Sequence, residues 1–392
     1  MNHSPVNQFD PARPEAWSSQ SDGPFLLRGR RPLYAPRLAE RLTPGALDTL
    51  AARSHATFSK MDGAAGEKIL VGSIPYDRSA EDAIYRPRWV EEVFPAGLAA
   101  SNAQHWAVQG LPTAEGYAKA VAQALTRLGP DLPKVVLSRS LNLRGETPVN
   151  LGALLARLTK DPAVAAFVTP LPPVAGTPRH MVGASPELLV SRRGRRVESN
   201  PLAGSLPRAR AATAGEAAKA MLSGADKDRR EHALVVEAVA DALSPFCAEL
   251  SVPPLPSVQS TQSMWHLGTR ISGQLKEDTP VAALVAALHP TPAICGAPRT
   301  AADALLRALE GYDRGFYAGA VGWMDERGDG DWYITLRCAE TCGNSVRLFA
   351  GAGIVEGSDP NCEVIETSAK FLAMLSALGV DETGAPLKDS RV

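Results

Sequence analysis

Two pairs of acidic residues, far apart in the 392-residue chain, repeat a spacing that could hold a metal ion. Asp228 and Glu231 lie in one predicted helix, and Glu363 and Glu366 lie in another. Residues three apart share one face of a helix, so each helix would present two carboxylates to the same side. Mg²⁺ prefers a few carboxylate oxygens together with water and an anionic substrate. Exposed acidic residues are also common on ordinary helix faces, so each pair alone is consistent with either interpretation.

The second pair is flanked by features that could bind an anion. Asp359-Pro360 predicts the start of its helix, because Asp can cap free N–H groups and Pro suits the first helical position. Lys370 then falls on the same face as Glu366, one turn further along. The small residues 350–353 (AGAG) predict a turn that precedes this helix. Such a turn and helix could hold a divalent cation next to an anion.

Four further side chains are candidates for chemistry, and each has an ordinary structural alternative. Lys134 begins a predicted strand and Glu187 follows a proline, and simple surface positions would explain both. His266 lies on a mainly apolar strand, where a buried histidine without a catalytic role is the more common case. Arg337 falls inside a predicted strand and would be either a partly buried ion-pair partner or a fork for a carboxylate.

Hydrophobic periodicity predicts the elements that must position these groups. Helices are expected at 45–54, 113–128, 150–158, 211–250, 281–288, 301–309 and after Asp359. Strands are expected at 25–37 (one edge strand), 68–74, 134–139, 164–169, 181–190 (two short strands) and 264–271, and loops at 200–205 and 289–298. Three further strands at 315–323, 331–340 and 345–349, joined by short turns, predict a meander.

Composition excludes several classes of protein. The apolar content of 45% is ample for a large core, and the formal net charge of −1 gives no support for nucleic-acid binding. No apolar run approaches the roughly 18 residues that a membrane helix needs, and the N-terminal segment lacks the pattern of a secretory signal. The five cysteines are an odd number without CxxC spacing, which argues against a disulfide framework and a zinc site. A cytoplasmic protein with free thiols is expected.

Segments in a fixed order along residues 69 to about 376 resemble the chorismate-utilising, Mg²⁺-dependent enzymes. They are ILVGSIPYD, KVVLSR, GASPELLVSR, NPLAGS, KDRREHALVVEAV, LHPTPAICGAPR, GFYAGAVGW, YITLRCAE and AGAGIVEGSDPNCEVIETSAK. The family includes anthranilate, aminodeoxychorismate and salicylate synthases, and this chain is most similar to its isochorismate synthases. So many ordered matches are far more specific than any single motif.

The resemblance implies an α+β fold in which large antiparallel β-sheets pack on each other with helices on the outside. It also implies that Glu231 and Glu366 bind Mg²⁺ directly, with Asp228 and Glu363 behind them through water. The family usually has a glutamate at the first of these outer positions, so Asp228 is a shortened version of it.

For the substrate, chorismate, the resemblance implies contacts with both carboxylates. The implied substrate-binding residues are Gly204, Ser205, Ala293, Tyr317, Arg337, Gly351, Gly353 and Lys370. Arg337, Tyr317 and Lys370 would hold the pyruvyl carboxylate, assisted by backbone amides at the two glycines of the AGAG segment. Mg²⁺ would hold the ring carboxylate, with His266 nearby.

Catalysis in the resembled family uses a base and an acid. Lys134 resembles the general base that activates water for attack at ring carbon 2, and Glu187 resembles the general acid that protonates the hydroxyl leaving carbon 4. Burial or a nearby cation can give a lysine the lowered pKa that a neutral base needs. A hydroxyl is a poor leaving group and needs a carboxylic acid whose pKa a closed site has raised.

Two positions separate members of this family. Relatives that use ammonia have glutamine where Lys134 stands, and one branch has a nucleophilic lysine at the position of Ala293. Both residues therefore favour water over ammonia as the nucleophile. The expected enzyme is an isomerase that converts chorismate to isochorismate. Its expected use is siderophore biosynthesis through 2,3-dihydroxybenzoate or salicylate. The alternatives are a salicylate synthase, which also eliminates pyruvate, a menaquinone-pathway isochorismate synthase, and a non-catalytic chorismate-binding homologue.

Domain organisation is expected to be simple. We expect residues 1–23 to be disordered, 24–112 to form the N-terminal part of the fold, 113–378 to form the chorismate-binding catalytic region, and 379–392 to form a C-terminal tail. The expected partner is a small molecule, and neither nucleic acid nor membrane is an expected partner. The resemblance implies a monomer.

Overall fold

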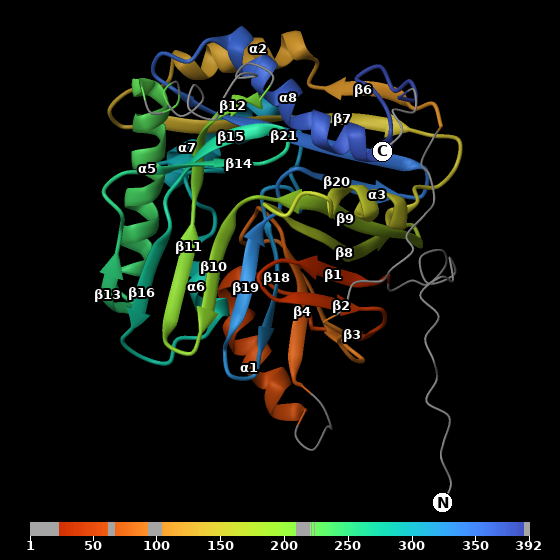
Figure 1. The fold of residues 1–392 in the computed structure, drawn as a ribbon, viewed down its shortest axis with the longest axis vertical. Helices are drawn as coiled ribbons and strands as arrows, with labels where there is room; N and C mark the ends of the chain where they lie inside the picture. The colour runs from red at the N-terminus through yellow and green to blue at the C-terminus, as the bar shows by residue number, and fades with distance from the viewer. Residues whose placement is uncertain are drawn as a thin grey trace, which may run out of the picture.

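The computed structural model describes residues 23–61, 67–92, 104–208, 220, 222 and 224–387. The segment expected to be disordered, apart from Gly23, and residues 388–392 of the expected tail lie outside these residues. Within them the chain forms two nine-stranded antiparallel sheets and one three-stranded sheet, with helices on the outside (Figure 1). The predicted α+β architecture is confirmed. No helix of the described part is long and apolar enough to cross a membrane.

The three sheets draw strands from distant parts of the chain. The first sheet has the order β17 (Gly296–Ala297), β7 (Lys134–Arg144), β21 (Ser345–Val355), β20 (Cys338–Cys342), β9 (Thr177–Ser185), β8 (Ala165–Val174), β1 (Phe25–Arg28), β2 (Pro32–Ala35), with β6 (Ala107–Leu111) beside β7. The second has the order β13 (Cys247–Ser251), β16 (Ile271–Leu275), β11 (Arg196–Asn200), β10 (Leu188–Arg193), β19 (Gly330–Ile334), β18 (Ala320–Asp325), β4 (Ile69–Ile74), β5 (Ala83–Pro87), β3 (Leu38–Arg41). The third consists of β12 (Leu202–Pro207), β15 (Met264–Gly268) and β14 (Ser257–Ser260).

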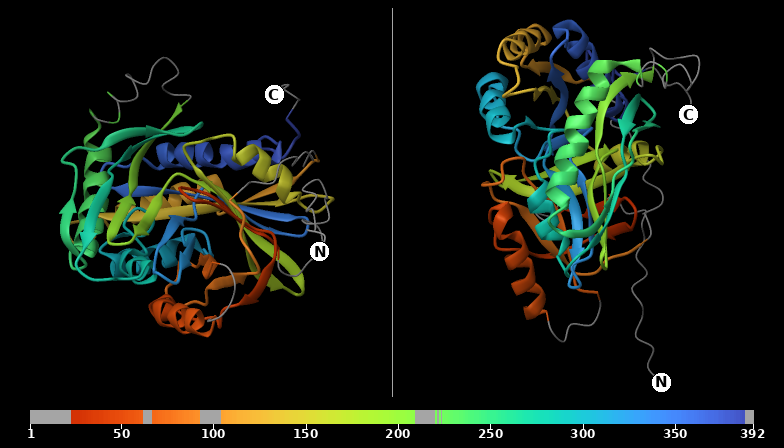
Figure 2. Two further views of the ribbon diagram at one scale, coloured as in Figure 1. Left: turned by 60° about the horizontal axis from the view of Figure 1, so that its bottom comes forward. Right: turned by 90° about the vertical axis from the view of Figure 1, so that its left-hand side faces the viewer.

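Helices cover the outer faces of the sheets. They are the short 3₁₀ helix Leu47–Thr49, α1 (Leu50–Lys60), α2 (Ala114–Leu125), α3 (Leu151–Leu158), α5 (Asp226–Leu243), α6 (Val281–Leu288), α7 (Arg299–Glu310) and α8 (Pro360–Leu378). The turned views in Figure 2 show α5 running along the side of the molecule, and both α5 and α8 contact β12. These two helices are the ones that carry the acidic pairs.

Strand alternation divides the core into two layers. Phe25 and Leu27 of β1 belong to the apolar cluster that also contains residues of the second sheet, whereas Leu26 belongs to a separate cluster beneath α3 and α8. Successive side chains of a strand point to opposite faces, so the first sheet buries both of its faces. Burial on both faces makes the strands near its centre rigid supports for a site.

Three predicted boundaries near the candidate residues are wrong. Residues 331–340 were expected as one strand of a meander, but they form β19 and β20, which belong to different sheets. The predicted turn at 350–353 lies inside β21, which pairs continuously with β7. The predicted loop at 200–205 forms most of β12. In each case pairing with a distant strand decides the conformation, and local periodicity carries no information about it.

Other predicted elements also differ from the structure. The single edge strand expected at 25–37 is a hairpin of β1 and β2, and the strand at 264–271 divides into β15 and β16 of different sheets. The helix predicted for 211–250 spans Asp226–Leu243 in the described part, and β13 follows it. The first portion of that prediction, at 211–219, lies outside the described residues.

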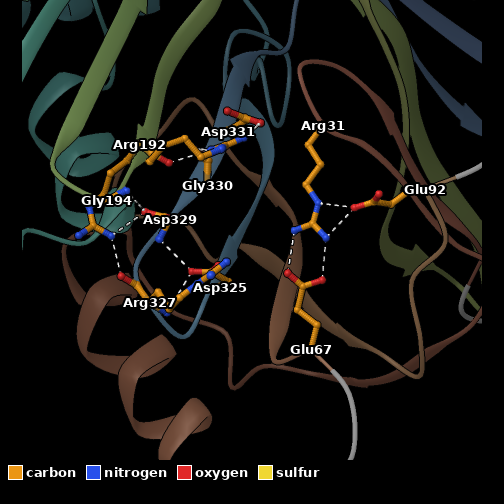
Figure 3. Close-up of polar contacts among 11 residues, drawn as sticks. Arg31, Glu67, Glu92, Arg192, Gly194, Asp325, Arg327, Asp329, Gly330 and Asp331 are labelled. Carbon is orange, nitrogen blue, oxygen red and sulfur yellow. Dashed lines mark hydrogen bonds and ion pairs between the residues drawn. The ribbon is translucent and has the colours of Figure 1, made fainter.

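A charged network holds the far end of the second sheet. Buried Arg192 donates to Asp329 Oδ1 at 3.0 Å and to the Arg327 carbonyl at 2.6 Å, as Figure 3 shows. Beside it, Arg31 makes two hydrogen bonds of 2.7 Å to the Glu67 carboxylate. A bidentate pair fixes the orientation of the two side chains, but at an exposed position it adds little to the free energy of folding. The network therefore fixes the turn between β18 and β19.

Candidate active site

One cavity gathers most of the predicted site residues where the first sheet, β12 and β15 meet α5 and α8. Its lining includes Glu187, Gly204, Ser205, Glu231, His266, Ala293, Tyr317, Arg337, Gly351, Gly353, Glu366 and Lys370. The remaining three candidates lie next to this lining. Lys134 contacts Glu231, Asp228 packs against Gly204, and Glu363 lies on the same helix as Glu366. The structure therefore brings together every residue that the sequence singled out.

The acidic pairs are placed by their helices as the spacing predicted. Asp359 caps α8 by accepting hydrogen bonds of 2.9 Å from the backbone N–H groups of Asn361 and Cys362. Glu363 and Glu366 then project inward from the first turns of α8, toward the pair on α5. A capped helix start of this kind sets the rotation of the helix, and so the direction of both carboxylates.

Burial and mutual repulsion dominate the electrostatics of these carboxylates. Burial, with the neighbouring Glu366 charge, raises the pKa of Glu363 to about 7. Burial, with the Glu231 charge, raises the pKa of Asp228 to about 6. Burial would also raise the pKa of Glu366, but the Lys370 ammonium and a hydrogen bond from Ser205 hold it below its usual value. Carboxylates that repel one another in this way are suited to share a cation.

Lysines pair with three of the carboxylates. The distances are 3.0 Å for Lys134 Nζ to Glu231 Oε1, 2.5 Å for Lys227 Nζ to Glu363 Oε1, and 2.6 Å for Lys370 Nζ to Glu366 Oε1. Within the described residues, no three His, Cys, Asp or Glu side chains are grouped as metal ligands. The sequence reasoning missed Lys227. Its position directly before Asp228 in the KDRREH segment was the available signal.

Lys134 is buried rather than solvated. Its side chain is 0% exposed at the start of β7, and within the described chain its Nζ has an ion-pair contact with Glu231 but no regular hydrogen bond. Gly353 on β21 pairs with Val136 of β7, and a Cβ there would lie 3.1 Å from Lys134 Cε and 2.0 Å from Glu231 Oε1. The glycine therefore makes room for both side chains.

Glu187 is also buried, in the turn between β9 and β10. Burial raises its pKa to about 8, because the ionised form loses hydration that the distant positive charges of Lys134 and Lys370 only partly replace. Its Oε1 has no hydrogen-bond partner among the described residues. Burial therefore favours the protonated form of Glu187 at neutral pH, and the residue lines the cavity.

Arg337 reaches the cavity because the backbone changes sheets at this residue. Its φ of +47° is unusual for a side-chain-bearing residue and costs on the order of 1–3 kcal/mol, which the packing on both sides must offset. Burial lowers its pKa to about 10, so it stays charged at neutral pH. Its Nη2 lies 3.4 Å from His266 Nε2. Burial, together with the charges of Arg337 and Lys370, holds the pKa of His266 well below its ordinary value, so the imidazole is neutral.

Two aromatic side chains also line the cavity. Tyr317 stacks on Phe349 with ring centroids 4.8 Å apart and an interplanar angle of 7°. Lys370 donates a hydrogen bond to the Gly351 carbonyl at 2.8 Å. The pairing of β20 with β21 ends at Leu348, and residues 349–353 of β21 then line the cavity. The cavity thus combines the cations of Arg337 and Lys370 with two aromatic side chains, which suits a small ring that carries carboxylates.

Comparison with known proteins places these residues in a family. Residues 86–379 match the model of the chorismate binding enzymes. Isochorismate synthase DhbC of Bacillus subtilis (strain 168) is 40% identical over 374 residues, covering 91% of this chain and 94% of the relative.

Solved structures show the same relationship. The crystal structure of DhbC from Bacillus anthracis, assigned as a 2,3-dihydroxybenzoate-specific isochorismate synthase, matches with a TM-score of 0.85 and 37% identity, covering 93% of this chain and 98% of that one. MenF, the menaquinone-specific isochorismate synthase from Escherichia coli, matches with a TM-score of 0.77 and 26% identity, covering 95% and 92%. The chain therefore belongs to the chorismate binding enzymes.

Proposed function

We propose that this protein is an isochorismate synthase, an isomerase that converts chorismate to isochorismate. The observation that carries the proposal is that one cavity is lined by buried Glu187, Arg337 and Lys370, while buried Lys134 lies beside it against the lining residue Glu231. The base and the acid come from β7 and from the β9–β10 turn, so the protein can address two positions of one ring. Similarity to proteins named as isochorismate synthases supports the same conclusion.

The proposed reaction needs a base that removes a proton from water and an acid that protonates the leaving hydroxyl. Lys134, in its neutral amine form, would accept a proton from the water that attacks ring carbon 2, and Glu187 would donate a proton to the hydroxyl that leaves carbon 4 as water. Each such transfer contributes roughly 10²- to 10⁴-fold to the rate. Arg337, Tyr317 and Lys370 would hold the pyruvyl carboxylate, which fixes the ring between the base and the acid.

We further propose that Mg²⁺ is bound by Glu231 and Glu366, with Asp228 and Glu363 behind them through water. The donor set fits this ion, since Mg²⁺ prefers carboxylate oxygens and Glu363 Oε2 is buried without a hydrogen-bond partner among the described residues. When bound, the ion would supply positive charge to the ring carboxylate of chorismate. His266, neutral and close to Arg337, would lie near that carboxylate.

Removal of divalent cations is expected to abolish turnover, and added Mg²⁺ should restore it. The physical reason is that the repelling carboxylates of α5 and α8 cannot hold an anionic substrate without a cation between them. Glu366→Gln should weaken binding of Mn²⁺, measured by electron paramagnetic resonance, together with binding of chorismate. Glu356→Gln, an exposed neighbour on the loop before α8, is the matched control. Undiminished turnover in EDTA would contradict the proposed metal site.

Gly353→Ala is expected to lower kcat by roughly 10- to 100-fold with little loss of folding stability. The new Cβ would meet Glu231 Oε1 at 2.0 Å, and the flexible carboxylate end would have to move away from its position beside Lys134. Gly129→Ala is the control, since nothing lies within 4 Å of a Cβ there. Steady-state kinetics and thermal melts of both variants provide the measurement, and wild-type kcat in Gly353→Ala would be the contrary result.

We propose that the isochorismate serves siderophore biosynthesis through 2,3-dihydroxybenzoate or salicylate. Similarity to the Bacillus anthracis protein described as specific for 2,3-dihydroxybenzoate supports the first of these routes. Deleting the gene should then impair growth under iron limitation, with rescue by 2,3-dihydroxybenzoate or salicylate. Rescue by a menaquinone instead would point to the menaquinone pathway. Salicylate and pyruvate as the main early products of the purified protein would show a salicylate synthase.

A further inference from the structure

A buried ion pair behind the cavity has no part in the chemistry proposed above. Glu310, the last residue of α7, and Arg314, in the following loop, are 4% and 3% exposed. Arg314 Nε lies 2.9 Å from Glu310 Oε2, and its Nη2 lies 2.5 Å from Oε1. Removing two charges from water costs free energy that a buried pair often fails to recover. The other contacts of the pair show what it holds in place.

Arg314 joins two backbone segments that line the cavity. Its Nη1 donates to the Ile294 carbonyl at 2.6 Å, and its Nη2 donates to the Val136 carbonyl at 2.8 Å. Val136 is two residues beyond Lys134 on β7, and Ile294 follows Ala293 in the proline-rich loop. Both Val136 and Ile294 line the cavity. The guanidinium therefore links the strand of the proposed base to the loop facing it. It adds to the backbone hydrogen bond from the Val136 N–H to the Cys295 carbonyl and to the pairing of β17 with β7.

The pair also fixes the strand and the aromatic wall. Glu310 Oε1 accepts hydrogen bonds of 2.7 Å from both the backbone N–H and the hydroxyl of Ser138 on β7. The Arg314 carbonyl accepts from the N–H of Tyr317 at 3.0 Å, and its guanidinium carbon lies 5.9 Å from the Tyr317 ring. The two side chains thus connect β7, the proline-rich loop and the Tyr317 wall at a single point.

We propose that the Glu310–Arg314 pair is a positioning element of the active site. The proposal rests on the proposed function, since it states that the pair fixes the positions of Lys134, the Ala293–Ile294 loop and Tyr317 relative to bound chorismate. Neither side chain lines the cavity, so the pair acts through these segments and touches no substrate. It makes no hydrogen bond or ion pair with Arg337, Lys370 or the acidic residues of α5 and α8 in the described structure. Its loss should therefore lower kcat more than it raises KM.

Two variants and one control test this assignment. Arg314→Lys keeps the charge but cannot span both carbonyls, because an ammonium lacks the planar fork of a guanidinium. The double variant Glu310→Gln/Arg314→Met removes both charges while glutamine can still accept from Ser138, and replacing a whole buried pair is often nearly neutral for stability. Arg192→Lys is the matched control, since Arg192 is equally buried but belongs to the network at the far end of the second sheet (Figure 3).

The expected result is a fall in kcat of about 10²-fold in both Arg314 variants, because displacements near 1 Å have effects of that size. KM for chorismate should stay within about threefold, since Arg337 and Lys370, the proposed charged groups for the carboxylate, make no contact with the pair. Arg192→Lys should keep wild-type kcat even where its melting temperature falls. Wild-type kcat in the folded Arg314 variants, a KM effect alone, or loss of folding in the double variant would each overturn the assignment. Conversion of chorismate to isochorismate by the wild-type protein in the same assay tests the proposed function, independently of the variants that test the pair.

Discussion

Lys134→Ala is expected to abolish conversion of chorismate, with kcat lowered by roughly 10²- to 10⁴-fold. Lys134 is a buried amine beside this cavity, at the start of β7, and its ion-pair contact is with the carboxylate of Glu231. Without it, the proposed attacking water would have to lose its proton without a positioned base. The measurement is steady-state kinetics with product identification by chromatography, at saturating chorismate and Mg²⁺.

Controls separate this loss of the base from loss of structure. Lys134→Met keeps much of the apolar volume of the side chain, so it should be as inactive as Lys134→Ala but pack better. Lys160→Ala, at an exposed position, should leave kcat unchanged. Circular dichroism and thermal melts should show a folded protein for all three variants. Substantial turnover in folded Lys134→Met would rule out the proposed role of Lys134.

Glu187→Gln is expected to lower kcat by a similar factor of roughly 10²- to 10⁴-fold. Glutamine has nearly the same shape, but it has no acidic proton to give to the hydroxyl that leaves carbon 4. The buried carboxylic acid of Glu187 has a pKa of about 8, so wild-type kcat/KM should fall as pH rises through about 8. The residual activity of Glu187→Gln should not show this fall of kcat/KM above pH 8. A variant that keeps both the wild-type rate and the fall at high pH would contradict the role of Glu187 as the general acid.

Folding stability gives an independent check on the same residue. Folded Glu187 keeps its proton up to about pH 8, whereas an unfolded glutamate loses it near the ordinary glutamate pKa of 4.5. Between these values the folded state binds more protons than the unfolded state, so rising pH reduces the free energy of unfolding. Glu187→Gln lacks this contribution. Its melting temperature should therefore rise relative to wild type as pH increases from 5 to 8.

The sequence by itself determined the local parts of this protein. Asp359-Pro360 predicted the start of α8, and the i, i+3 spacing placed Glu363 and Glu366 on one face of it, because capping and helical periodicity depend on near neighbours in the chain. The ordered motif segments also identified the chorismate-utilising family, which the comparisons confirm. The catalytic and metal-binding roles of the residues stay predictions.

Only the tertiary structure decided which groups are buried and which segments pair. The AGAG segment forms a strand rather than a turn because β7, two hundred residues earlier, supplies its hydrogen-bond partners. Arg337 turns into the cavity because the chain passes there from one sheet to the other, and a strand pattern read from neighbours cannot show that change. Burial of Lys134 and Glu187, the partner Lys227, and the Glu310–Arg314 pair likewise depend on contacts between distant segments. Such contacts arise from packing of the whole chain, so local sequence could name the reacting groups but not their environment.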